Sequence, residues 1–240
     1  GAYQWEFDRM KPGLEQQQAY RYVQEMIPAV KALWQGDYTH EGEFWQFPMT
    51  TSVPKPVQRP HPPLWVAARS PVTFDFAARN DCHIMSWALA RPVSEVQIYL
   101  DRFEKALKDN NVSARPIFAT MRQTAVYARP DDADPYLDAL ITKSGRFENL
   151  FQNLADVRDG FPAPVDLKQI STRSEFDRET LRTNLMFGTP TEVIDKLIAY
   201  DRLGVDHFIY SASYGLDMAL QKQSLKLLIN EVMPAFINGT

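Results

Sequence analysis

Hydrophobic side chains recur every three or four residues along much of this chain, which is the spacing of a helix that buries one face. In the first such stretch Tyr22, Met26 and Val30 share one face, and Pro28 is expected to bend the helix. Proline in the first turn marks the start of two later helices. The predicted helices span residues 14–34, 70–80, 92–109, 189–204 and 216–232.

Short hydrophobic runs alternate with these helices. Residues 64–68 form an uninterrupted apolar run, which is typical of a strand buried on both faces. Further strands are predicted at 82–87, 117–127 and 206–211. Strands that alternate with helices indicate parallel strands joined by right-handed crossovers, which form either an open doubly wound sheet or a closed barrel.

Two segments interrupt this alternation. Residues 36–63 are rich in proline, so we expect an extended connection with room for short strands only. Residues 129–183 are polar and contain only short helical patterns such as 136–141, and we interpret them as an excursion from a single domain that spans residues 1–240. No helix is predicted at the start of the chain. An eight-stranded barrel needs about 250 residues, so a barrel with so few recognisable strands would lack a substantial part in this sequence.

The composition describes a globular protein, with 45% hydrophobic and 23% charged residues among 240. Its formal net charge is −4 and no basic stripe stands out, so a nucleic-acid partner is not expected. The apolar runs are shorter than the roughly 20 residues of a spanning helix, so we expect no membrane segment and no signal peptide. One cysteine, Cys82, cannot form an internal disulfide, which favours the cytoplasm.

Metal chemistry finds little support in the sequence. The four histidines do not share the spacing of metal ligands, and no cysteine pair accompanies them. The paired carboxylates Glu41 with Glu43, and Glu6 with Asp8, have nothing nearby that would shift a pKa, so we interpret them as solvated surface charge. We therefore predict no metal site.

The junction between the first predicted strand and its helix carries the most informative residues. Ser70 and Thr73 lie one helical turn apart, and the first N–H groups of a helix have no partner within it. An anion such as phosphate binds well at such an end, and both hydroxyls would donate to it. Simple capping of the helix by Ser70 is the alternative. Trp87 ends the next strand, where it would either stack beside a flat cofactor or belong to the core.

The order of several segments resembles the bacterial luciferase-like, flavin-dependent monooxygenases, over roughly the C-terminal two thirds of the family domain. The segments are Gly1-Ala2-Tyr3-Gln4, Glu43-Phe44-Trp45, Pro54-Lys55-Pro56-Val57-Gln58, His61-Pro62-Pro63-Leu64-Trp65-Val66-Ala67, Phe187-Gly188-Thr189-Pro190 and Val232-Met233-Pro234. The resemblance implies an α/β fold, a (β/α)8 TIM barrel of the bacterial luciferase type that lacks its N-terminal strands and helices in this sequence.

The resemblance also implies cofactors and partners. Relatives use reduced FMN from a separate flavin reductase, together with O2, to oxygenate a small organic molecule, and many form homodimers. Some relatives use a deazaflavin and transfer hydride instead. Phe147, Phe151 and Phe161 either indicate an apolar substrate or pack the excursion onto the barrel. A flavin-binding protein that has lost catalysis is the alternative from a different functional class.

Residue by residue, Ser70 and Thr73 match the phosphate-binding positions of the family. Arg69 departs from the family, where an acidic or small residue is common; it would either add charge to the phosphate site or point outward. Tyr3 matches the loop that lines the flavin site, and residues 129–183 match the mobile segment that covers it.

The strand end at Met85, Ser86 and Trp87 matches the region near the flavin ring. The resemblance also implies residues that lie outside this sequence, because an arginine on the phosphate and a histidine that is catalytic in many members precede the position of Gly1. The catalytic residues are therefore expected upstream of Gly1, and we expect the 240 residues to be part of a longer chain.

Overall fold

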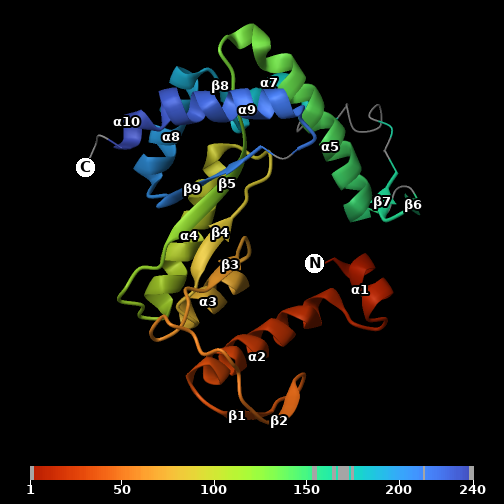
Figure 1. Ribbon diagram of the computed structural model, residues 1–240, viewed down its shortest axis with the longest axis vertical. Helices are drawn as coiled ribbons and strands as arrows, with labels where there is room; N and C mark the ends of the chain where they lie inside the picture. The colour runs from red at the N-terminus through yellow and green to blue at the C-terminus, as the bar shows by residue number, and fades with distance from the viewer. Residues whose placement is uncertain are drawn as a thin grey trace.

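The computed structural model describes residues 3–152, 156–163, 166, 173, 176–212 and 214–237. Its centre is a parallel sheet that alternates with helices along the chain (Figure 1). The strands of this sheet are β3 (Trp65–Ala67), β4 (His83–Ser86), β5 (Phe118–Val126), β8 (Met186–Gly188) and β9 (His207–Ser211). Four of them lie where the hydrophobic runs predicted strands.

The long strand β5 organises the sheet. Its first residues pair with β4, its middle pairs with β9 and its last residues pair with β8, all in parallel. On the other side of β4 lies β3, with Ala67 opposite Met85. Parallel pairing places the carboxyl ends of neighbouring strands at a common edge. The loops that follow β3 and β4 are therefore neighbours, although about 20 residues separate them in the chain.

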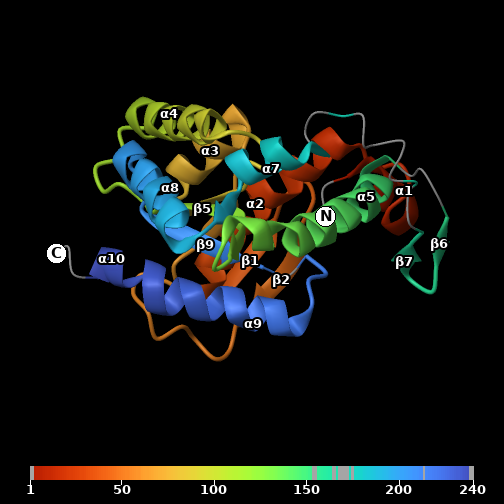
Figure 2. The ribbon, with the colours of Figure 1, turned by 90° about the horizontal axis from the view of Figure 1, so that it is seen from above.

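Three helices cover one face of the sheet: α3 (Pro71–Arg79), α4 (Val93–Asp109) and α8 (Pro190–Leu203) (Figure 2). They agree closely with predicted helices, because each carries an apolar face and a matching start or stop signal. Thr189 and Glu192 form the capping box of α8, and Gly204 ends that helix in a left-handed conformation with φ of 92°. The core between sheet and helices includes Ile84, Phe103, Phe118, Val126 and Val193, among others.

The chain closes with α9 (Met218–Leu227), the π-helical turn Leu228–Val232 and α10 (Pro234–Ile237). Leu228 and Val232 join the same core. No described helix is both long and apolar enough to cross a membrane.

The first quarter of the chain is built from α1 (Gln4–Met10), α2 (Gln16–Gln35) and the antiparallel hairpin of β1 (Tyr38–Glu41) and β2 (Gln46–Thr50). The prediction of no leading helix was wrong, because α1 is only seven residues long and has a weak periodic signal. Helix α2 continues through Pro28. The hairpin provides the short strands expected within residues 36–63.

The excursion contains more regular structure than its composition suggested. After a 3-10 turn, Pro130–Ala133, come α5 (Asp134–Gln152), the two-residue strands β6 (Val157–Arg158) and β7 (Phe161–Pro162), and α7 (Arg178–Asn184). The prediction of only short helical patterns was wrong for α5, which has 19 residues. The predicted pattern at 136–141 covers only the first part of this helix, which continues to Gln152. Tyr136, Leu137 and Leu140 form a buried stripe along it.

Strand β8 was not predicted, because its apolar run, 185–187, is shorter than the run at 64–68 that predicted β3. A lysine from α8 fixes it from outside the sheet. The Lys196 Nζ donates to the carbonyl oxygens of Arg182, Leu185 and Phe187 at 2.6, 2.8 and 2.8 Å. Burial lowers the pKa of Lys196 to about 8, and the three carbonyls hold the ammonium in place. The end of α7 and the start of β8 are therefore tied to α8.

Candidate functional site

The hydroxyl groups of Ser70 and Thr73 lie together where β3 runs into α3. Ser70 is the N-cap of α3, with extended backbone angles of −91° and 151°. Its Oγ lies 2.9 Å from the Thr73 Oγ1, and the Thr73 N–H approaches the same Oγ at 3.4 Å. Ser70 is exposed and Thr73 is half-buried. Ser70 therefore caps α3, which is the alternative stated in the sequence analysis, and anion binding by the two hydroxyls stays a prediction.

Two arginines add positive charge around this helix start. The Arg102 Nη1 donates to the Arg69 carbonyl oxygen at 2.7 Å and thereby links α4 to the residue that precedes Ser70. Arg69 itself is exposed. Burial and Glu95 raise the pKa of Tyr99 on α4, while the charges of Arg69 and Arg102 oppose that rise. The charge of Arg69 therefore acts on Tyr99 of α4, and its contribution to a phosphate site stays a prediction.

The neighbouring strand β4 presents its side chains alternately to the two faces of the sheet. Ile84 and Ser86 are buried on the helix-covered face, whereas Met85 is 37% exposed on the opposite face. Trp87 follows Met85 by two residues and continues that open face. Only Met85 and Trp87 therefore offer side chains to a ligand there, and Ser86 offers its backbone.

The Trp87 side chain is half-buried, and its indole N–H has no hydrogen-bond acceptor among the described residues. Its ring lies 6.0 Å, between centroids, from that of Phe147 on α5. A buried indole N–H normally finds a partner. The Trp87 N–H and the neighbouring Ser86 hydroxyl are thus both buried without a partner among the described residues.

The loop that follows Trp87 is held by a buried arginine on β5. The Arg122 side chain is fully buried, and its Nη1 and Nη2 donate to the carbonyls of Leu89 and Pro92 at 2.8 and 3.4 Å. Its Nε donates to the Tyr200 hydroxyl of α8 at 2.7 Å. Asn184 of α7 reaches the same loop. The sequence analysis missed Arg122, although a charged residue in the middle of a predicted strand was the available signal.

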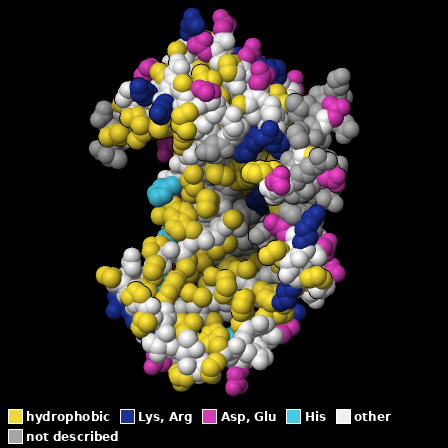
Figure 3. Space-filling view, turned by 45° about the vertical axis from the view of Figure 1, so that its right-hand side comes forward, with side chains coloured by type: hydrophobic (Ala, Val, Ile, Leu, Met, Phe, Trp, Pro, Cys, Tyr) yellow, Lys and Arg dark blue, Asp and Glu magenta, His cyan; other side chains and the backbone are white. Residues whose placement is uncertain are grey.

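The open face of the sheet is hydrophobic. Trp65 and Met85 are 41% and 37% exposed, and hydrophobic side chains gather over the recessed middle of the molecule (Figure 3). Of the three phenylalanines that suggested an apolar substrate, Phe147 lies against Trp87, whereas Phe161 is 76% exposed. The Phe151 side chain lies outside the described part of the chain.

Tyr3 occupies the N-cap of α1, where its N–H donates to the Glu6 carboxylate at 3.1 Å. In both ribbon views α1 lies near the far end of α5 (Figures 1 and 2). Helix α1, which Tyr3 caps, thus lies on the α5 side of the molecule, and Ser70 and Thr73 lie together at the start of α3.

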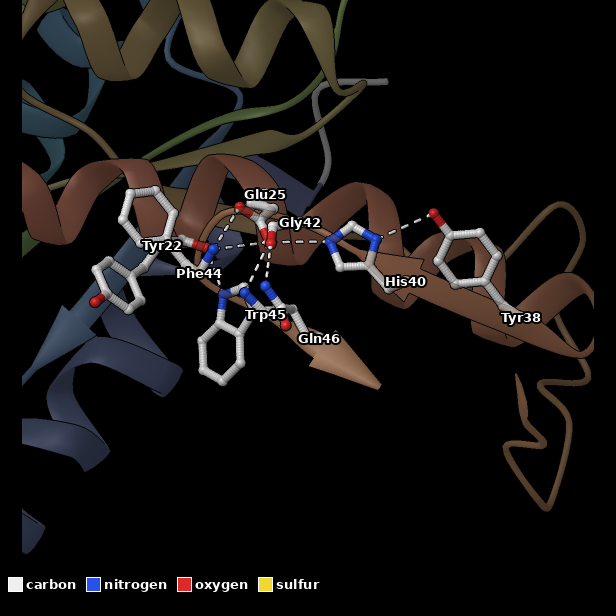
Figure 4. Close-up of polar contacts among 8 residues, drawn as sticks. All are labelled: Tyr22, Glu25, Tyr38, His40, Gly42, Phe44, Trp45 and Gln46. Atoms are coloured by element: carbon white, nitrogen blue, oxygen red, sulfur yellow. Dashed lines mark hydrogen bonds and ion pairs between the residues drawn. The ribbon is translucent and has the colours of Figure 1, made fainter. Parts of the chain in front are cut away.

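A second polar cluster, which the sequence did not reveal, joins α2 to the hairpin (Figure 4). The Glu25 carboxylate accepts hydrogen bonds from the Trp45 and Phe44 amides at 2.8 and 3.0 Å and lies 3.0 Å from the His40 Nε2. Tyr38 contacts the other nitrogen of that ring at 3.2 Å. Burial alone would raise the pKa of Glu25, but these hydrogen bonds outweigh it and lower the pKa. The cluster fastens the hairpin to α2 rather than facing the sheet.

Replacing Gly42 by alanine is expected to loosen this hairpin. A Cβ at Gly42 would overlap the Glu25 carboxylate and press on the His40 ring. Overpacking of this kind costs about 1–3 kcal/mol of unfolding free energy, which urea denaturation followed by circular dichroism would measure. The matched control is Gly36→Ala, where a Cβ meets no atom within 4 Å. Equal stability of the two variants would contradict the role assigned to Glu25.

Comparison with known proteins decides the family. The sequence profile of the luciferase-like monooxygenases matches residues 1–207. The chain belongs to the luciferase-like monooxygenase family. This result confirms the resemblance noted in the sequence, and it accounts for the alternation of parallel strands and helices.

Two relatives and one structure illustrate the family. The chain is 39% identical over 236 residues to the oxygenase component of a flavin-dependent trigonelline monooxygenase from Acinetobacter baylyi, covering 98% of this chain and 66% of the relative. It is 26% identical to an FMNH2-dependent dimethylsulfone monooxygenase from Pseudomonas putida, covering 82% and 54%. A crystal structure of a monooxygenase from Streptomyces bottropensis has a TM-score of 0.70 at 20% identity, covering 98% and 67%.

The chain thus spans about two thirds of the first relative and about half of the second. The structural similarity confirms the predicted fold class, a luciferase-type TIM barrel. Among the described residues, five strands are joined by hydrogen bonds and do not close into a ring.

Proposed function

We propose that this chain forms the flavin-binding part of the oxygenase component of a two-component monooxygenase. It takes reduced FMN from a separate reductase and uses O2 to oxygenate a small organic substrate. The observation that carries the proposal is the Ser70–Thr73 hydroxyl pair at the start of α3, next to strand β4, which Trp87 follows. The names of the two curated relatives, an oxygenase component and an FMNH2-dependent enzyme, support it.

The residues present fit the phosphate and the ring of FMN. Ser70 and Thr73 would donate their hydroxyl protons to the phosphate, and the helix dipole together with Arg69 would favour its negative charge. The orphaned Trp87 N–H would donate to a polar atom of the ring system, and Met85 would contact the ring from the open face of β4. Tyr3 is proposed to line the same site from α1.

When bound, reduced FMN supplies the electrons with which O2 is activated. The chain's own task is then binding, orientation and exclusion of water. Arg122 anchors the loop after Trp87, and the Phe147 ring of α5 lies against the Trp87 ring. An apolar cover of this kind limits access of water to reactive groups beneath it.

Anaerobic titration of the purified protein with FMNH2, followed by tryptophan fluorescence, tests the proposal. We expect saturable binding, and consumption of O2 coupled to a substrate when a flavin reductase is added. A parallel titration with reduced deazaflavin separates the closest alternative. Preferential binding of the deazaflavin would replace this proposal by a hydride-transferring oxidoreductase, and tight binding of FMNH2 without turnover would indicate a flavin-binding protein without catalysis.

A further inference from the structure

A lysine of α5 lies on the face of that helix that is directed toward Trp87. Lys143 follows the buried Leu140 by three residues and precedes Phe147 by four. Residues with these spacings share one side of a helix. Leu140 packs in the core, and Phe147 contacts the Trp87 ring at 6.0 Å between centroids. Lys143 therefore lies between the core and the covered tryptophan.

The ammonium group of Lys143 has no counter-charge in the described structure. Its side chain is half-buried, and no hydrogen bond or ion pair reaches its Nζ from a described residue. Burial alone lowers the pKa of Lys143, because no neighbouring carboxylate offsets the loss of solvation. Buried charges in proteins are normally paired.

The acidic residues of α5 are already engaged elsewhere. Asp134 and Asp138 both bind Arg178 at 2.6 Å, and Glu148 binds Arg173 at 2.7 Å. These ion pairs connect α5 to the segment that follows it. They leave the positive charge of Lys143 uncompensated beside an apolar surface that includes Phe147 and Trp87.

We propose that Lys143 binds the carboxylate of a small organic-acid substrate, whose apolar body packs against Phe147 and Trp87. Lys143 acts as a specificity-determining residue: the ammonium donates hydrogen bonds to the carboxylate, and no covalent step involves it. The inference rests on the proposed function, because it places the substrate beside the proposed flavin site. The sequence analysis predicted only that the substrate is apolar, and this proposal adds that the substrate carries a negatively charged carboxylate.

Matched pairs of acids and neutral amides test this proposal on the protein without flavin. The probes are benzoate with benzamide, nicotinate with nicotinamide, and cyclohexanecarboxylate with cyclohexanecarboxamide. Isothermal titration calorimetry is expected to show that the wild type prefers the acids by about tenfold or more, the usual effect of a charged hydrogen bond. Lys143→Met should abolish this preference and Lys143→Arg should retain it. Lys222→Met, which removes an exposed charge on α9, is the control.

Two further readouts separate the proposal from its alternatives. Lys143→Met should melt at or above the temperature of the wild type, because it removes an unpaired half-buried charge; a lower melting temperature would indicate a structural lysine and overturn the proposal. FMNH2 affinity should be unchanged in Lys143→Met, and a matching loss would mean that Lys143 binds the flavin instead. The inference is also overturned if the wild-type protein binds the acids no more tightly than the matching amides. Failure of the wild type to bind FMNH2 would overturn the proposed function separately.

Discussion

Ser70→Asp is expected to weaken FMNH2 binding about 100-fold while leaving α3 intact. Aspartate is as good an N-cap as serine, so the helix start keeps its stability. The new carboxylate, however, removes a donor and places negative charge where the phosphate would bind, and a charged hydrogen bond alone contributes about 1.5–3 kcal/mol. Anaerobic fluorescence titration would measure the dissociation constant, and thermal unfolding would confirm the fold.

The control is Ser113→Asp, the same substitution at an exposed position in the loop between α4 and β5. This loop leads to the amino end of β5, whereas Ser70 follows the carboxyl end of β3. Thr73→Val should lose about tenfold, because it removes one hydroxyl and preserves the branched shape. Unchanged FMNH2 affinity in Ser70→Asp would show that the phosphate does not bind at the start of α3.

Arg122→Met is expected to lower the free energy of unfolding by about 3 kcal/mol, which makes it the most damaging single substitution considered for stability. Methionine fills part of the volume but leaves the Tyr200 hydroxyl and the Leu89 carbonyl without their donor. Equilibrium unfolding in urea, followed by far-ultraviolet circular dichroism, would measure the loss. Arg122→Lys should fall between methionine and the wild type, because an ammonium lacks the guanidinium fork.

Arg129→Met provides the comparison, since the side chain of Arg129 is 76% exposed and pairs only with Asp132. An exposed pair of this kind contributes about 0–1 kcal/mol. Equal stability of the two methionine variants would show that the hydrogen bonds of Arg122 to Leu89 and Tyr200 do not stabilise the fold. Because Arg122 holds the loop after Trp87, Arg122→Met should also reduce FMNH2 affinity at temperatures where it remains folded.

These predictions place the proposed site on a rigid frame. The cradle at Ser70 and Thr73 begins a helix that packs directly on the core, and the Trp87 loop is held from β5 and α7. The cover on α5 belongs to the excursion, which is connected to the sheet through a smaller core around Tyr136 and Leu140. Flavin affinity is therefore expected to depend on residues of the sheet and of α3, whereas substrate specificity is expected to depend on residues of α5.

Local patterns in the sequence determined much of the frame. The apolar runs at 64–68 and 206–211 and the proline-marked starts of α3 and α8 predicted elements that the structure contains, because period, capping and burial all favoured the same conformation there. The pair Ser70 and Thr73 was also found from the sequence, since both members lie within one helical turn. The family resemblance rested on such contiguous segments.

Features that depend on contacts between residues far apart in the sequence became visible only in the tertiary structure. Strand β8 has only a short apolar run and exists because it pairs with β5. The Glu25 cluster joins residues about 20 positions apart, and the acceptors of Arg122 lie 30 or more positions away. The proposed role of Lys143 depends on the length of α5, because this helix extends to Phe147, whose ring lies against Trp87. The spacing of hydrophobic residues indicates which side of a helix or strand is buried. Only the tertiary packing determines which residues that side contacts.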